Sequence, residues 1–281
     1  MLDVDFLVIG SGLAGANAAL RLASGGTVLL VSKRGIADAA TVYAQGGIAS
    51  VVSDEDSLDA HVKDTLEAGA GLCDAAAVRS IVADGPSAIA RLASLGVLFD
   101  RDESGYSLGR EGGHSNRRIL HAKDLTGREI MRALQERLVN LPRVRVLTEH
   151  TAIDLITRRK LGRGASDRCL GAYVLDNTTG EVKTVRARAT LLATGGAGKA
   201  YLYTSNPDVS TGDGVAMAFR AGARVGNMEF YQFHPTVLFH PHAKSFLISE
   251  ALRGEGGVLR RRDGRALMRG VHPLGDLAPR D

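Results

Sequence analysis

With 281 residues the chain is long enough for one large domain or two ordinary ones, and 44% hydrophobic and 23% charged residues are typical of a soluble globular protein. The net charge of +4 is mild, which argues against nucleic-acid binding, and no apolar run approaches the length of a membrane span. The 34 glycines against 7 prolines favour tight turns and close approach of backbone to ligands, as in nucleotide-binding α/β folds.

The chain begins with MLDVDF, whose acidic residues lack the basic region of a secretory signal. We therefore expect a cytoplasmic protein without a membrane anchor. Its two cysteines, Cys73 and Cys169, match no metal or redox spacing and are expected to be reduced thiols. No metal site is predicted.

The first predicted elements have the order strand, glycine-rich turn, helix, strand. An apolar run at residues 5–9 leads into Gly10, Gly12 and Gly15, an alanine-rich helix follows, and residues 27–32 (TVLLVS) form the second strand. This is the context that the dinucleotide fingerprint G-x-G-x-x-G requires. Gly10 permits the tight turn, Gly12 lets backbone N–H groups reach a pyrophosphate, and Gly15 lets the helix pack on the strand. The helix N-terminus adds a partial positive charge.

The second predicted strand ends in Ser32, Lys33 and Arg34 instead of the acid that usually accepts ribose hydroxyls. Lys33 and Arg34 could hold the 2′-phosphate of NADP. The fingerprint alone leaves that alternative open.

Three further glycine-containing motifs follow. They are TVYAQGGIA at residues 41–49, LLATGG at 191–196, expected to be a buried strand ending in a turn, and TGDGVAMA at 211–218, with Asp213 at the start of a helix. In this order after a Rossmann-like opening, they resemble the family of succinate dehydrogenase and fumarate reductase flavoproteins, with its soluble L-aspartate oxidases. The resemblance runs from Leu7 to the end of the chain, apart from a basic loop at residues 158–168. The cofactor it implies is FAD.

The resemblance also implies how the flavin is attached. In the respiratory relatives a histidine just before the T-V-x-A-Q-G-G run carries FAD covalently, but here that position is Ala40, so we expect non-covalent FAD. The resemblance also implies that Asp213 binds the cofactor, and its alternative role is an ordinary helix N-cap. The cofactor-binding residues implied are Gly10, Ser11, Gly12, Leu13, Ala14 and Gly15 around the pyrophosphate, Lys33 near the adenosine half, Ala40, Thr41, Val42, Tyr43, Ala44, Gln45, Gly46 and Gly47 on the flavin side, and Asp213.

The middle of the chain predicts a helix followed by a small β region. Thr126 and Glu129 suggest a capping box that opens a helix over residues 128–140. The β-branched segments 144–157 and 170–194 are expected to return to the main sheet.

The predicted fold class is α/β. We expect a Rossmann-like, doubly wound FAD-binding domain with a β-rich insertion over residues 1–229, and the beginning of an α+β capping domain over residues 230–281. Since the family continues beyond this point, the chain is expected to be truncated at its C-terminus.

The resemblance implies several substrate-binding residues in the capping segment. His234, in the motif Gln232-Phe233-His234-Pro235, matches a residue that binds a substrate carboxylate, and Ser249 with Glu250 stands where the family usually has Thr-Glu. Arg280 matches the arginine that donates or accepts a proton beside the substrate carbon. By composition alone, its high pKa would make it an ion-pair partner. Arg253 could contact substrate or be structural.

One carboxylate stands out in the segment REGGHSNRRILHA, residues 110–122. In the respiratory relatives the position of Glu111 is not acidic. A carboxylate there is useful if the substrate brings a cation, as aspartate does with its α-amino group. The alternative is a loop salt bridge with Arg110, Arg117 or Arg118. His114, Arg117, Arg118 and His121 are expected to be mainly structural, although His114 could line the flavin pocket.

The resemblance therefore implies oxidation of L-aspartate to iminoaspartate, with the Cα hydride passing to the flavin and O₂ or fumarate as electron acceptor. This is the first step of NAD biosynthesis via quinolinate, and quinolinate synthase is the expected partner, with small dicarboxylates as substrates. Two alternatives are a flavoprotein subunit of a respiratory complex and an inactive, truncated FAD-binding fragment.

Overall fold

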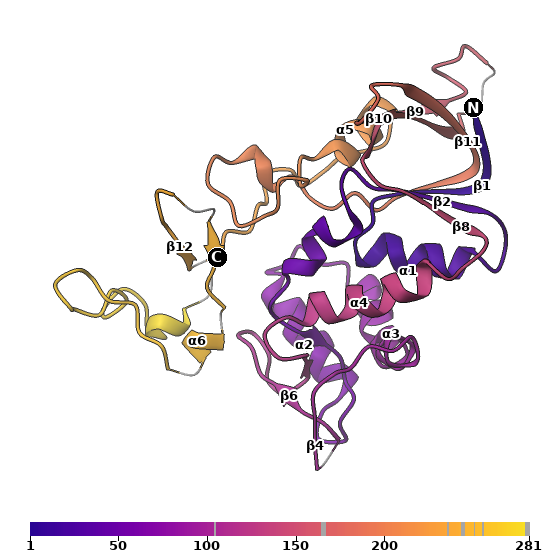
Figure 1. Cartoon of the computed structure of the whole chain (residues 1–281). Coiled ribbons are helices and arrows are strands. Elements are labelled where there is room, and N and C mark those ends of the chain that lie inside the picture. Colours follow the sequence, from indigo (N-terminus) through magenta and orange to yellow (C-terminus); the bar gives the residue numbers. More distant parts are fainter. Residues whose placement is uncertain are drawn as a thin grey trace. The chain divides into compact units, whose positions relative to one another are not determined.

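The computed structural model describes residues 1–103, 105–163, 167–234, 236–242, 245–249, 251–254 and 256–278. It contains two compact units, each built from two stretches of the chain. Figure 1 shows the chain with its helices and strands labelled. Unit 1 comprises residues 1–43 and 130–231, and unit 2 comprises residues 44–129 and 232–281. The predicted division into a cofactor domain and a capping domain at residues 229 and 230 remains a prediction.

Unit 1 is built on a mixed six-stranded sheet with the strand order β8-β2-β1-β11-β10-β9. Neighbours among β8, β2, β1 and β11 are parallel, and β10 pairs antiparallel with both β11 and β9. The predicted return of a β-rich insertion to the main sheet is thus confirmed. The strands are β1 Leu2–Ile9, β2 Val28–Val31, β8 Val144–Leu147, β9 His150–Thr157, β10 Cys169–Asp176 and β11 Val182–Leu192.

Helices pack on both faces of this sheet. Helix α1 (Leu13–Leu22) contacts β1 and β2, while α5 (Asp213–Arg220) contacts β9 and inserts Met217 into the main core cluster. Side chains alternate between the faces along each strand, so Leu7 belongs to the α5 core while Val8 faces the opposite side, and both are fully buried. This is the doubly wound arrangement that the sequence predicted.

The motif at residues 191–196 departs from its prediction. It does end β11 beside β1, but Leu191 is 40% exposed, so the expectation of a buried strand is wrong. β11 continues directly from the antiparallel β region, and its side chains alternate between core and solvent as in a one-sided sheet.

The α4 helix (Thr126–Leu138) begins at Thr126, two residues before its predicted start. The Thr126 hydroxyl accepts the Ala122 N–H at 3.0 Å, and Glu129 accepts the Leu98 N–H at 2.8 Å. Both side chains of the expected capping box therefore bind backbone N–H groups of residues that precede the helix.

Unit 2 contains a helix pair that the sequence analysis did not assign, α2 (Leu58–Ala68) and α3 (Ala75–Ser94). Their N-caps are regular, because Ser57 accepts the Ala60 N–H and Asp74 accepts two first-turn N–H groups. A small sheet has the order β3-β7-β6. The remaining elements are β3 Ile48–Ala49, β4 Arg101–Asp102, β5 Gly105–Tyr106, β6 Leu108–Gly109, β7 Ile119–Leu120, β12 Val237–Leu238, β13 Phe246–Leu247 and α6 Ala251–Gly254.

Among the helices formed by the described residues, none has both the length and the apolar character needed to span a bilayer.

Candidate functional site

The first βα turn of unit 1 is a cradle that only glycine permits. Gly10 has φ of +111°, and a Cβ there would lie 2.1 Å from the Ala193 carbonyl oxygen. A Cβ on Gly15 would lie 1.8 Å from the Gly10 carbonyl oxygen. The predicted tight turn and the predicted close packing of helix on strand are both confirmed. Gly12 stands at the N-cap of α1 without a side-chain cap, which leaves the helix start open to an acceptor.

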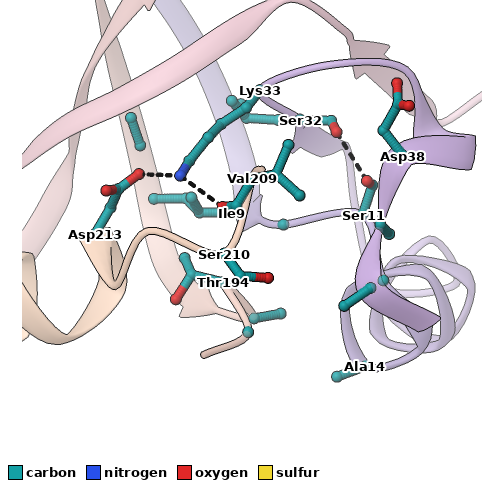
Figure 2. A pocket seen from close by; sticks show the side chains of 18 of the residues that line it. Ile9, Ser11, Ala14, Ser32, Lys33, Asp38, Thr194, Val209, Ser210 and Asp213 are labelled. Atoms are coloured by element: carbon teal, nitrogen blue, oxygen red, sulfur yellow. Dashed lines mark hydrogen bonds and ion pairs between the residues drawn. The ribbon is translucent and has the colours of Figure 1, made fainter. Parts of the chain in front are cut away.

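A cavity of about 330 Å³ opens at this turn and lies wholly within unit 1 (Figure 2). Its wall combines the glycine turn with the ends of β2 and β11 and the start of α5. The pyrophosphate residues predicted from the fingerprint are therefore brought together with Lys33, Ala40, Thr41 and Asp213. The Leu13 N–H donates to the Thr41 hydroxyl at 3.1 Å, which ties the helix start to the segment that follows β2.

Lys33 and Asp213 form an ion pair at one wall of the cavity (Figure 2). The Lys33 ammonium also donates to the Val209 carbonyl at 2.9 Å, and the Thr211 hydroxyl donates to Asp213 at 2.8 Å. Both charged groups are partly exposed, so each can also reach a ligand in the cavity. Asp213 is the first residue of α5, and Gly212 occupies the N-cap with φ of +78°. The alternative role of Asp213 as the N-cap is therefore wrong.

Ser11, one of the predicted cofactor-binding residues, shares a hydroxyl hydrogen bond of 2.8 Å with Ser32 at the cavity (Figure 2). Several other residues that line the cavity were missed from the sequence. His150 also lines it, is buried, and donates its backbone N–H to the Ser32 carbonyl at 2.9 Å. The available signal was its place at the start of β9, shortly after the end of β8, the strand that pairs with β2. Asp38, Thr194 and Ser210 also line the cavity.

His150 belongs to a polar cluster at the edge of the cavity. Its Nε2 lies 3.2 Å from the Lys183 ammonium and 3.6 Å from the Asp176 carboxylate, and Lys183 contacts Asp176 at 2.8 Å. Hydrogen bonds from Lys183 and Thr178 hold the pKa of Asp176 well below its usual range.

The predicted flavin-side segment, residues 40–47, crosses from unit 1 into unit 2. Its first part, Ala40–Tyr43, is a 3₁₀ turn, and Ala40 offers no nucleophile. In unit 2 the Gln45 side-chain amide donates to the Leu247 carbonyl at 3.1 Å, while its buried Oε1 has no hydrogen-bond partner among the described residues. A Cβ on Gly47 would lie 2.2 Å from the Leu120 carbonyl oxygen, so the segment packs tightly on β7.

Glu111 lies in unit 2 beside this segment, since a Cβ on Gly46 would lie 3.2 Å from its Oε1. Within the described part of the chain its carboxylate makes no hydrogen bond or ion pair. The arginines expected to neutralise it bind elsewhere, because Arg110 donates to the His114 carbonyl at 2.9 Å and Arg117 to the Leu108 carbonyl at 3.3 Å. The alternative of a loop salt bridge is therefore wrong.

The third arginine, Arg118, is completely buried in unit 2. It forms two hydrogen bonds with Asp56, of 2.7 and 2.8 Å, and a third with Asp64. Burial lowers the pKa of His61 and His114, and the Arg118 cation beside them lowers it further. Both imidazoles are therefore neutral at pH 7. Arg118 is structural, as expected.

The substrate-binding residues predicted in the C-terminal segment are only partly visible. His234 Nδ1 lies 2.8 Å from the Thr236 carbonyl oxygen, and Gln232 and Ser249 lie in the same segment. Arg253 is buried and donates to the Asp276 carbonyl at 2.6 Å, which supports a structural role. Glu250 and Arg280 lie outside the described residues.

The geometry of unit 1 fits a dinucleotide. Two glycines let strand, turn and helix pack closer than a Cβ would allow, a helix N-terminus without a side-chain cap offers N–H groups to a pyrophosphate, and a lysine and an aspartate flank the cavity. In unit 2 the unpartnered Oε1 of Gln45 is an acceptor without a donor, as expected of a residue that meets a ligand.

Comparisons with known proteins agree with this geometry. The family model of an FAD binding domain matches residues 5–281. L-aspartate oxidase 1 of Ralstonia nicotianae is 55% identical over 100% of this chain and 53% of its own length, and L-aspartate oxidase of Yersinia pestis is 52% identical over 99% and 53%. A mutant of E. coli quinol fumarate reductase superposes with a TM-score of 0.89 at 31% identity, covering 100% of this chain and 49% of that one. The chain spans about half the length of the curated relatives it matches.

Proposed function

The chain belongs to the FAD-binding flavoprotein family of succinate dehydrogenase, fumarate reductase and L-aspartate oxidase, and from this premise we propose that it serves the oxidation of L-aspartate to iminoaspartate. The cofactor is FAD. The observation that carries the substrate assignment is the carboxylate of Glu111 beside Gly46, which has no hydrogen-bond or ion-pair partner among the described residues. A substrate with two carboxylates and one ammonium group complements that carboxylate, whereas succinate does not.

The cofactor would be held by the cradle of unit 1 and by residues 40–47. The N–H groups at the start of α1 would face the pyrophosphate. Lys33 and Asp213 would bind polar groups of the cofactor next to the pyrophosphate. Because Ala40 has no nucleophilic side chain, the cofactor is held without a covalent bond. When bound, the isoalloxazine supplies the redox chemistry that no amino-acid side chain can supply.

The chain's own residues orient the substrate and move its protons. Glu111 accepts hydrogen bonds from the α-ammonium group, which fixes the Cα–H direction and favours oxidation of L-aspartate over that of succinate. His234 and Ser249 bind the substrate carboxylates, and the resemblance assigns substrate binding to Gln232 and Glu250 as well. Arg280 donates or accepts the proton at the substrate carbon. These four assignments, and that of Arg280, rest on the family resemblance.

The experiment that tests this function compares two substrates on the flavin-loaded protein. Glu111→Gln should slow reduction of the flavin by L-aspartate much more than its reoxidation by fumarate, because only aspartate carries the cation. A charge-assisted hydrogen bond is worth roughly 1.5–3 kcal/mol, so the expected loss in kcat/KM is about one to two decades for aspartate alone. Equal losses for both substrates would refute the assignment of aspartate.

The cellular setting follows from the product. Iminoaspartate is hydrolysed by water, so an enzyme that consumes it should act nearby, and quinolinate synthase in the cytoplasm is the partner we propose. Electron acceptors are O₂ or fumarate. A second candidate, the flavoprotein subunit of a respiratory complex, is favoured by the similarity to fumarate reductase. Ala40 argues against it, and covalently bound flavin on a denaturing gel would reverse that choice.

A further inference from the structure

The loop that carries Glu111 and the segment that carries Gly46 are joined to the same short strand. The loop leaves β6 at Gly109 and re-enters the sheet at β7, where Gly109 pairs with Ile119. β7 also pairs with β3, the strand that directly follows Gly47. The distance between the Glu111 carboxylate and the flavin-side segment therefore depends on how the intervening loop is held.

The C-terminal end of this loop is held through Arg118, whose side chain binds two aspartates from earlier in the chain. Arg118 is 0% exposed, and its guanidinium binds Asp56 through two parallel hydrogen bonds and Asp64 through a third. In general, a protein in which apolar residues replace such a buried ion cluster is no less stable than the original. What a buried ionic cluster adds is a defined geometry, because each of its charges tolerates few arrangements of its partners.

The loop itself is hydrogen-bonded to the same aspartates. The Asn116 amide donates to Asp56 at 2.7 Å, and the Ser115 backbone N–H and hydroxyl each donate to Asp64 at 2.8 Å. Between these anchors and Glu111 stand two glycines, of which Gly113 has φ of +82° and no atom within 4 Å of its Cβ position. Without the anchors such a segment has many conformations, and holding Glu111 in one of them would cost entropy on binding.

We propose that Asp56, Asp64 and Arg118, through Ser115 and Asn116, are positioning residues that hold Glu111 beside Gly46 and thereby set the selection of amino-bearing dicarboxylates. None of them touches substrate. The proposal rests on the proposed function, in which Glu111 binds the α-ammonium group. It adds that this selectivity depends on the buried cluster of Asp56, Asp64 and Arg118 as well as on the Glu111 carboxylate.

The test removes single anchors from the loop in the flavin-loaded, full-length protein. Ser115→Ala and Asn116→Ala should each lower kcat/KM for L-aspartate by about tenfold and change that for fumarate less than about twofold. Ser115→Thr keeps the hydroxyl and should restore wild-type values. Asn140→Ala, which removes an exposed asparagine at the end of α4, is the matched control and should change neither substrate.

Two measurements without turnover complete the test. Calorimetry should show that Asn116→Ala weakens binding of α-methyl-L-aspartate, which has the amino group but no Cα hydrogen to lose, and leaves succinate binding unchanged. Amide hydrogen exchange at Ser115 should become faster in the same variant. A purely structural role would lower thermal stability while leaving the preference between the two ligands intact, and that result would overturn the proposal.

The two proposals fail in different ways. In a Glu111→Gln background, Asn116→Ala should have no further effect on aspartate, since the group being positioned is gone. Selective loss in Glu111→Gln without any in Asn116→Ala or Ser115→Ala would overturn the positioning role and leave the function intact. No selective loss in Glu111→Gln itself would overturn the assignment of the ammonium contact.

Discussion

Replacing Arg118 by leucine should be among the most destabilising single changes in unit 2. The guanidinium is fully buried, and its two partners have side chains that are 1% and 9% exposed. Arg118→Leu removes three charge-assisted hydrogen bonds and leaves two carboxylates facing each other away from water. Breaking a buried ion pair from one side costs roughly 3–5 kcal/mol, because the remaining charge is uncompensated. We expect a loss of that size in the free energy of unfolding at pH 7.

The pH dependence of this loss has a defined sign. Burial by itself raises the pKa of Asp56, but hydrogen bonds from Arg118, Asn116 and Ser57 outweigh it and lower the pKa to about 2. A carboxyl whose pKa falls from 3.8 to about 2 stabilises the wild-type fold by roughly 2 kcal/mol above pH 4, and that contribution disappears as the pH falls toward 2. In Arg118→Leu the guanidinium no longer opposes the effect of burial, so the pKa of Asp56 rises and its protonation at low pH relieves the buried charge. The difference between the two proteins should therefore shrink on acidification.

The assay is guanidinium-induced unfolding followed by far-ultraviolet circular dichroism, at pH 7 and at pH 3, which lies between the ordinary pKa of 3.8 and the value of about 2 that Asp56 has in the folded protein. Arg117→Leu is the matched control, since Arg117 is exposed and, among the described residues, its side chain donates only to the Leu108 carbonyl at 3.3 Å. It should change the free energy of unfolding by less than about 0.5 kcal/mol. A loss below about 1 kcal/mol for Arg118→Leu, or an equal loss at both pH values, would refute the reasoning.

Three further predictions concern the cofactor and the reaction. Gly15→Ala should abolish FAD retention on gel filtration, because the added Cβ would lie 1.8 Å from a carbonyl oxygen of the cradle; a fully flavin-loaded variant would contradict the packing argument. Acid precipitation of the loaded protein should release all of the yellow colour to the supernatant, since Ala40 cannot bond to the flavin, and fluorescence on the denatured band would count against this. Arg280→Leu should keep FAD, measured by absorbance, and lose reduction by aspartate. Normal turnover in that variant would leave Arg280 as an ion-pair residue.

The parts of the fold that local sequence patterns determine were predicted well. The βαβ opening with Gly10 and Gly15 follows from an apolar run, a glycine spacing and an alanine-rich helix, and each of these is visible within about thirty residues. The errors arose where tertiary context decides. Leu191 looked buried because its motif is apolar, but its exposure depends on what covers the sheet at that point. The N-cap remained an alternative role for Asp213 because its neighbour Gly212, the actual N-cap, carries no side chain to signal its own role.

The buried cluster of unit 2 could not have been found from the sequence. Arg118 meets Asp56 and Asp64 across separations of 62 and 54 residues, and no short motif encodes such a meeting. His150 was missed for the same reason, because its contact with the cavity depends on the strand beside β2. Glu111 was found because an acid among glycines and arginines is unusual, but only the structure showed that its neighbouring arginines bind elsewhere.

The pairing of β1 with β11 sets an order for folding during synthesis. Residues 2–9 lie beside residues 185–192, so the central strand pair cannot form until residue 192 has left the ribosome. The α2 and α3 helices contact one another and depend on nearby residues, so they can form much earlier. The glycine cradle needs Ala193 against Gly10, and its cavity needs Asp213, so a nascent chain gains its nucleotide pocket only near the end of unit 1. We therefore expect the flavin to bind after most of unit 1 has folded. It should then stabilise the position of β1 and not direct the formation of that strand.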